Sequence, residues 1–113
     1  MLQRALRLEQ TTRVRHREVA QTIYAGLADF YVARHDPEDA LAVYAEAIQA
    51  MPDRSKFYVD SAELMLRMGR PARAEAMLAE MDRREPEDAD QFEYEVARIR
   101  EKVAQPGAAE PAQ

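Results

Sequence analysis

The chain contains no cysteine and only three glycines among its 113 residues. The lack of cysteine excludes disulfide bonds and thiolate metal sites, but it does not indicate a compartment. The sequence has no apolar run long enough to span a bilayer, and its start, Met1-Leu2-Gln3-Arg4, is not that of a secretory signal. A cytoplasmic location is therefore the default expectation, with a periplasmic or membrane-attached parent protein as the open alternative.

The residues that are present favour a soluble, helix-rich fold. Hydrophobic residues make up 47% of the chain and charged residues 33%, and a chain of 113 residues forms one domain at most. Charge is distributed unevenly, because residues 1–20 hold five arginines against two glutamates. The remaining 93 residues therefore carry −8, which gives the net charge of −5. This acidic body favours a basic or mixed-charge peptide partner.

A pattern of spaced residues occurs twice, at an offset of 34 residues. The first copy comprises Tyr24, Leu27, Ala28, Tyr31, Pro37, Ala40, Tyr44, Ala47 and Pro52, and the second Tyr58, Ser61, Ala62, Met65, Pro71, Ala74, Leu78, Met81 and Pro86. This period resembles the tetratricopeptide repeat, a helix-turn-helix unit that stacks into a solenoid. The second copy fits more loosely, since Ser61, Met65 and Met81 depart from the family pattern. The resemblance implies an all-α, right-handed α-α superhelix of such repeats with a C-terminal capping helix.

The prolines and glycines mark where helices begin and end. We expect repeats over residues 21–54 and 55–88, a capping helix over 89–104 and a flexible tail over 105–113. Individual helices are predicted at 37–50, 54–68, 71–84 and from Pro86 or Asp88 to Ala104. Asp36 is expected to cap the helix that begins at Pro37, and Gly69 to end the helix before it. The inward residues of the helix over 37–50 are predicted to be Ala40, Leu41, Val43, Tyr44, Ala47 and Ile48.

Residues 1–20 form a basic N-terminal segment that has two interpretations. In one, residues 2–10 resemble the end of a repeat's second helix, and a new helix begins near Thr12 or Arg13. In the other, a single helix runs from the N-terminus to about Arg34. The predicted apolar stripe toward its end consists of Val19, Ala20, Ile23, Tyr24, Leu27, Phe30 and Tyr31. The N-terminal end then requires a preceding repeat of a longer, bacterial-type protein, or a homodimer through the face around Leu2, Leu6 and Leu8.

The resemblance also implies where a ligand binds, because the first helices of successive repeats in this family line a concave groove for a peptide. The corresponding residues are Thr22, Ala25, Gly26, Asp29, Val32, Ala33, Lys56, Val59, Asp60, Glu63, Leu66, Arg67, Asp90 and Glu93. Carboxylates outnumber cations among them, so the groove is expected to be mainly acidic; a solvated helix face is the alternative interpretation. One branch of the family binds chaperone tails that end in a carboxylate, using Lys and Asn. Ala25, Asp29 and Asp60 stand at those places, so acidic C-terminal peptides are expected not to bind.

Other functions have weaker support in the sequence. His16 and His35 lack metal-ligand spacing, and no nucleophile motif or acid/base pair of carboxylates is apparent, so no metal, cofactor or catalysis is expected. The tyrosines fall on core positions rather than on a stacking platform, so nucleic acid is not an expected partner. The basic run 13–17 is interpreted as a solvated helix end or a contact with an acidic protein. We therefore expect a protein–protein interaction module, with self-association of the parent protein as the alternative.

Overall fold

The structure is a computed structural model that describes the backbone of residues 2–105 and the side chains of residues 15–105. Its elements are α1 (Leu2–Ala33), α2 (Pro37–Ala50), α3 (Ser55–Arg67), α4 (Pro71–Arg84), the short 3-10 helix η1 (Ala89–Phe92) and α5 (Glu93–Ala104). No strand occurs in this part of the chain, which confirms the all-α prediction. The expected tail, apart from Gln105, lies outside the described residues.

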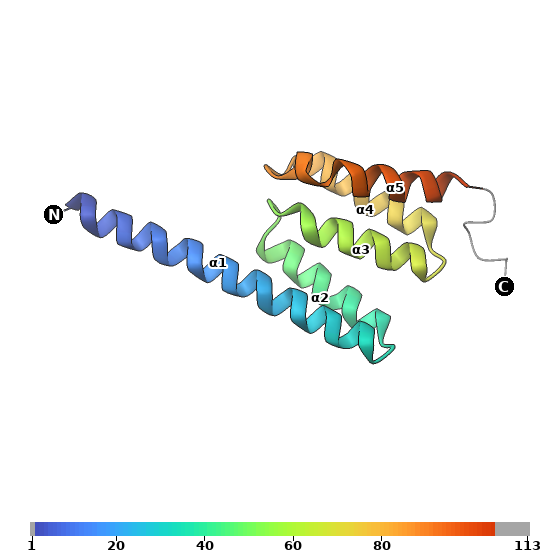
Figure 1. Cartoon of the computed structure of the whole chain (residues 1–113), viewed down its shortest axis with the longest axis horizontal. Coiled ribbons are helices and arrows are strands. Elements are labelled where there is room, and N and C mark those ends of the chain that lie inside the picture. The colour runs from blue at the N-terminus through green and yellow to red at the C-terminus, as the bar shows by residue number, and fades with distance from the viewer. Residues whose placement is uncertain (1, 106–113) are drawn as a thin grey trace.

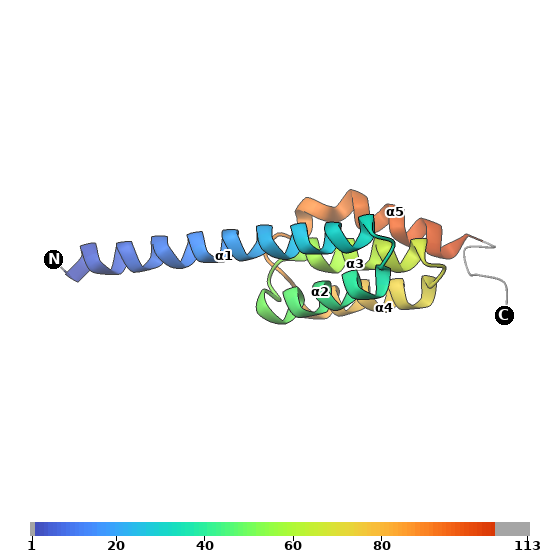
Figure 2. The ribbon, with the colours of Figure 1, turned by 90° about the horizontal axis from the view of Figure 1, so that it is seen from below.

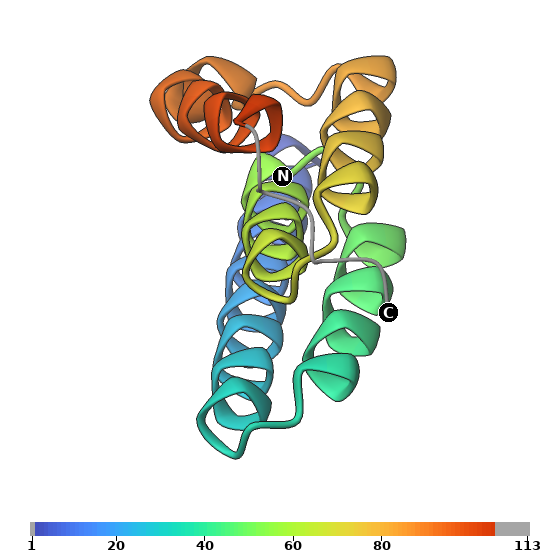
Figure 3. The same cartoon turned by 90° about the vertical axis from the view of Figure 1, so that its right-hand side faces the viewer.

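The helices form two rows (Figures 1, 2 and 3). Viewed along the helix axes in Figure 3, α1, α3 and α5 lie in one row, and α2 and α4 lie in the other. The hairpins α1–α2 and α3–α4 stack side by side, so that α3 packs against α2, α4 and α5. In contrast, α2 is the only described helix whose backbone closely approaches that of α1.

Helix bounds agree closely with the sequence prediction in the middle of the chain. α2 and α4 have the predicted bounds, and α3 is one residue shorter at each end. The two interpretations of the N-terminus are resolved in favour of one continuous helix, without a break at Thr11-Thr12. The last helix differs from its prediction, because residues 89–92 form a 3-10 turn before α5 begins.

The two hairpin turns are built by the same hydrogen bonds. In the first turn, the Asp36 N–H donates to the Tyr31 carbonyl at 2.9 Å and the His35 N–H to the Val32 carbonyl at 3.0 Å. The same two bonds recur 34 residues later, from Arg70 to Met65 and from Gly69 to Leu66, at 2.9 and 3.0 Å. Both turns are Schellman motifs, which require a left-handed residue after the helix. His35 and Gly69 fill that place, with φ of 61° and 75°.

One prediction about these turns is wrong. Asp36 forms no side-chain hydrogen bond to the start of α2. Its carboxylate instead lies 3.8 Å from the Arg34 Nε, while its backbone N–H takes part in the Schellman motif. The start of α2 therefore depends on Pro37 and on the acidic residues Glu38 and Asp39 of its first turn, which interact favourably with the helix dipole.

The core lies between the two rows and is tightest where small residues meet. Ala28, Ala40, Ala62 and Ala74 are fully buried, which allows the helices of each hairpin to approach closely. All six inward residues predicted for α2 are buried. The ring of Phe57 joins the two repeats, because its centroid lies 6.1 Å from that of Tyr24 and 6.5 Å from that of Tyr44.

The predicted apolar stripe of α1 is only partly buried. Ala20, Tyr24 and Tyr31 pack against the core. Four others, Val19, Ile23, Leu27 and Phe30, are exposed. These four positions of the stripe are exposed because, among the described helices, α1 has a neighbour on one side only.

Candidate functional site

The row formed by α1, α3 and α5, which we call the inner row, carries most of the residues predicted to bind a peptide. On α1, Thr22, Gly26, Asp29 and Ala33 are exposed, and Ala25 and Val32 are half-buried. On α3, Arg67 is exposed, and Lys56, Asp60, Glu63 and Leu66 are half-buried. A Cβ added at Gly26 would meet no atom within 4 Å, so the surface is open at this point. These residues are therefore accessible to a ligand.

Val59 is an exception among the predicted residues of α3. It is only 2% exposed and belongs to the hydrophobic core. α3 is flanked by α2 on one side and α5 on the other, so a wider arc of its surface is covered than on α1. The corresponding residue of the first repeat, Ala25, is only half-buried. Val59 thus supports the fold and does not line a binding surface.

The hydroxyl of Tyr44 lies among charged residues of both first helices. Burial, followed by the nearby carboxylates of Asp60 and Asp29, raises the pKa of Tyr44 to about 12, while Arg67 acts in the opposite direction. Charged residues of both α1 and α3 therefore influence the phenol that α2 contributes. The sequence prediction treated Tyr44 as a core residue alone, because the repeat pattern specifies an aromatic or aliphatic residue there and does not show where a hydroxyl points.

Both carboxylates on α3, Asp60 and Glu63, have cationic partners. The Lys56 ammonium lies 3.0 Å from Asp60, one helical turn away. Burial raises the pKa of Asp60, and the hydrogen bond from Lys56 partly opposes that rise. Glu63 accepts a hydrogen bond at 3.0 Å from Arg98, which α5 contributes. Arg98 was missed by the sequence prediction, since its reach to α3 depends on how α5 is rotated.

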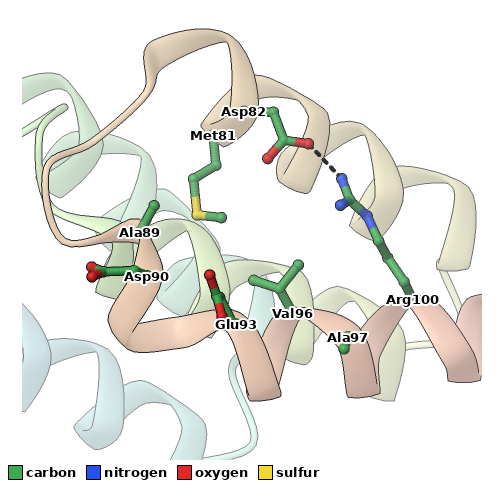
Figure 4. A pocket seen from close by; sticks show the side chains of 8 residues that line it. All are labelled: Met81, Asp82, Ala89, Asp90, Glu93, Val96, Ala97 and Arg100. Atoms are coloured by element: carbon green, nitrogen blue, oxygen red, sulfur yellow. Dashed lines mark hydrogen bonds and ion pairs between the residues drawn. The ribbon is translucent and has the colours of Figure 1, made fainter.

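Asp90 and Glu93 lie in a different place from the one predicted. They line a hollow of 610 Å³ between α4 and the segment formed by η1 and α5, together with Met81, Asp82, Ala89, Val96, Ala97 and Arg100 (Figure 4). All of these residues come from α4, η1 and α5. The 3-10 turn explains the difference: at about 3.0 residues per turn instead of 3.6, it rotates the residues before α5 away from the face that an uninterrupted α-helix would present.

Arg100 neutralises part of the charge beside this hollow. Its guanidinium donates to Asp82 at 2.7 Å and to Glu75 at 3.2 Å, which ties α5 to α4. The hydrogen bond to Asp82 and the charge of Glu75 raise the pKa of Arg100 further. Three of the carboxylates predicted to line the binding surface, Asp29, Asp60 and Glu63, lie on α1 and α3, and the latter two pair with cations from α3 and α5.

Comparison with known proteins agrees with this architecture. The sequence matches a family model of the tetratricopeptide repeat over residues 31–94. The chain belongs to the tetratricopeptide repeat family. Tetratricopeptide repeats generally mediate protein–protein interaction, so a protein partner is the expected ligand class. No curated protein and no solved structure gave a match to the chain.

Two further findings concern the described part of this tetratricopeptide repeat protein. Within it, no helix has both the length and the apolar character needed to cross a membrane. Nor do any three of its His, Asp or Glu side chains gather in an arrangement that could hold a metal ion. His16 and His35 are both exposed, the first on α1 and the second in the turn after it.

Proposed function

We propose that this chain is a protein–protein interaction module that binds a peptide along the inner row of α1 and α3. The observation that carries the proposal is that α1 and α3 lie in one row, with Asp29 and Arg67 exposed on them and Asp60 and Glu63 half-buried. Side chains on two separate helices then face one ligand, which is how the family's first helices generally act. Family members typically serve as non-enzymatic scaffolds, and the proposal assigns no catalytic step to this chain.

The ligand is a basic or mixed-charge peptide. Asp60 and Glu63 are already paired with Lys56 and Arg98, whereas Asp29 forms no ion pair with any residue from 15 to 105. A cation of the peptide therefore gains most by binding at Asp29. Arg67, which is exposed, favours an acidic group further along the same peptide, so mixed charge fits better than a uniformly basic sequence.

The experiment that tests this proposal is a titration with short labelled peptides. We would compare a peptide in which lysine alternates with leucine, one in which glutamate replaces lysine, and one that carries both charges. The mixed and basic peptides should bind more tightly than the acidic one, and added salt should weaken binding because exposed charges are screened. Asp29→Lys should weaken binding of the basic peptide about fivefold to tenfold, since an exposed pair contributes up to about 1 kcal/mol and the reversal adds repulsion.

A matched control is Glu46→Lys, which makes the same charge change at an exposed position of α2, in the other row. Binding should be unchanged in this variant. Equal weakening by both substitutions would show a general charge effect and would count against a site at Asp29. Preferred binding of the acidic peptide, or of a peptide ending in acidic residues, would contradict the proposed ligand class.

A further inference from the structure

The hollow between α4 and the segment formed by η1 and α5 takes no part in the proposed peptide site. Its volume of 610 Å³ is within the range of about 300–1,000 Å³ that is typical of ligand pockets. Met81 of α4 forms an apolar floor, and Ala89, Val96 and Ala97 contribute apolar atoms from η1 and α5. Figure 4 shows Met81 pointing from α4 toward α5 and Val96 pointing back toward α4. Apolar side chains from separate elements therefore face one space.

The rim of this hollow carries carboxylates that are only partly neutralised. Asp82 has a partner, because the Arg100 guanidinium donates to it at 2.7 Å. Asp90 and Glu93 are exposed, and they form no ion pair with any residue from 15 to 105. Figure 4 shows the Glu93 side chain directed toward Met81, so its charge lies at the edge of the apolar floor. The hollow thus combines an apolar surface with two carboxylates that a cation from outside can reach.

The second repeat shows what kind of element covers such a surface. At an offset of 34 residues, Glu93 and Val96 of α5 correspond to Val59 and Ala62 of α3, which are 2% and 0% exposed. The two elements that follow α3 in the chain, α4 and α5, both pack against it, and both are helices. No helix follows α5 within residues 2–105, where Glu93 is exposed and Val96 only half-buried. A helix is therefore the element whose shape fits the uncovered side of α5.

Charge specifies the chemistry of that helix. The place of the buried Val59 is taken on α5 by the carboxylate of Glu93, so a helix that covers this side must bring a cation to it. Residues 106–113 of the chain contain Glu110 and neither lysine nor arginine, so they cannot supply that cation. We infer that the hollow binds an amphipathic helix of a partner protein, with apolar residues against Val96 and Ala97 and a lysine or arginine beside Asp90 and Glu93.

This site is independent of the proposed peptide site. All of its lining residues come from α4, η1 and α5, whereas Asp29 lies on α1. The two sites also accept different ligands, since the first takes a peptide along α1 and α3 and the second takes a helix beside α5. Each can therefore fail without the other.

Fluorescence anisotropy with two labelled helical peptides of 14 residues, the length of α4, tests the ligand class. In one peptide, leucine and alanine on one helical face are flanked by lysine, and in the other peptide glutamate replaces lysine. The lysine peptide should bind, and the glutamate peptide should bind about fivefold more weakly or less, because an exposed ion pair contributes roughly that factor. Equal binding of the two peptides, or tighter binding of the glutamate peptide, would overturn the inference.

Two variants, each with a matched control on the same helix, test the location. Glu93→Lys should weaken binding of the lysine peptide about fivefold to tenfold, since it removes an attraction and adds a repulsion. Glu101→Lys makes the same change at an exposed position outside the hollow and should leave binding unchanged. Ala97→Phe should weaken binding because its ring fills part of the hollow, whereas Ala104→Phe, also exposed on α5, should not. Unchanged binding in either Glu93→Lys or Ala97→Phe would overturn the inference.

Asp29→Lys separates this inference from the proposed function. It should leave binding of the lysine helix unchanged. Weaker binding in Asp29→Lys, with none in Glu93→Lys, would place the helix on α1 and overturn the inference while the proposed peptide site stands. Light scattering of the unmodified chain should give the monomer mass, and a dimer that Glu93→Lys dissociates would show that a second copy fills the hollow, which would also overturn it.

Discussion

α1 and α3 hold the same place in successive repeats, yet their surroundings differ. α3 lies between two hairpin elements and buries residues on several sides, including Phe57 and Tyr58. α1 has a hairpin on one side only, and among its described side chains Ala28 alone is fully buried. The repeat pattern therefore determines the helical hairpin, whereas the neighbouring helices determine which side of each helix is buried in the core.

The largest expected difference is between Phe57→Ala and Ile23→Ala. Phe57 is fully buried between Tyr24 and Tyr44, so its truncation should lower the free energy of unfolding by about 3–5 kcal/mol. Ile23 is exposed in the monomer, and its truncation should change that free energy by no more than about 0.5 kcal/mol. Urea denaturation at a protein concentration that keeps the chain monomeric measures both. Similar losses in the two variants would show that the side of α1 that carries Ile23 is covered in the monomer.

A smaller effect is expected at the start of α3. The Ser55 N–H donates to the Asp88 carboxylate at 2.9 Å, so a residue of the turn after α4 caps the start of α3. The corresponding residue of the first repeat, Gln21, lies inside the continuous α1 and has no helix start to cap. Asp88→Ala should lower the free energy of unfolding by about 0.5–2 kcal/mol. Asp88→Asn, which keeps an oxygen acceptor, should recover most of this loss in thermal unfolding, and no recovery would argue against a capping role.

The two Schellman turns give a third comparison. Gly69→Ala should destabilise the fold by about 1–2 kcal/mol, because a left-handed φ is strained for a residue with a Cβ. His35 already bears that strain at φ 61°, so His35→Gly should stabilise the fold by up to about 1 kcal/mol, after the greater flexibility of glycine in the unfolded chain is subtracted. Melting temperatures of the two variants should therefore move in opposite directions. A shift in the same direction would contradict the equivalence of the turns.

The smallest effect concerns the ion pair between Arg17 and Asp53, which ties α1 to the turn before α3. Both side chains are partly exposed, so Arg17→Ala should cost at most about 1 kcal/mol. The hydrogen bond from Arg17 lowers the pKa of Asp53. A carboxylate whose pKa is lower when folded contributes stability that is complete above its unfolded pKa and is lost as the pH falls through the folded value. The difference between the unmodified chain and Arg17→Ala should thus disappear in acid, and a constant difference across this range would contradict the pairing.

The sequence predicted the parts of this fold that depend on local chemistry. Pro37 and Pro71 begin α2 and α4, and Gly69 adopts the left-handed backbone conformation of the turn after α3. Each of these residues acts through its own backbone conformation, which affects only a few neighbouring residues. Features that depend on the helix packed alongside were not predicted. Ile23 and Phe57 occupy equivalent positions, and only the stacked structure shows that the first is exposed and the second buried.

The candidate site shows the same division. The resemblance to the family predicted Asp29 and the charged residues of α3 as surface positions, and Asp29 is exposed. Asp90 and Glu93, which follow the start of the 3-10 turn at residues 89–92, line the hollow beside α4. The long side chain of Arg98 extends from α5 to Glu63 on α3. Neither feature could be predicted from the spacing of residues along the sequence. The first depends on a small change of helix type, and the second depends on how a neighbouring helix is rotated.

Hydrogen exchange followed by mass spectrometry tests most directly whether neighbouring helices decide the difference between α1 and α3. Slow exchange is expected in α3, because the stacked hairpins cover it on several sides. Faster exchange is expected in residues 15–27 of α1, where the side that carries Ile23 and Leu27 is exposed. Equal protection of these two segments would contradict this difference.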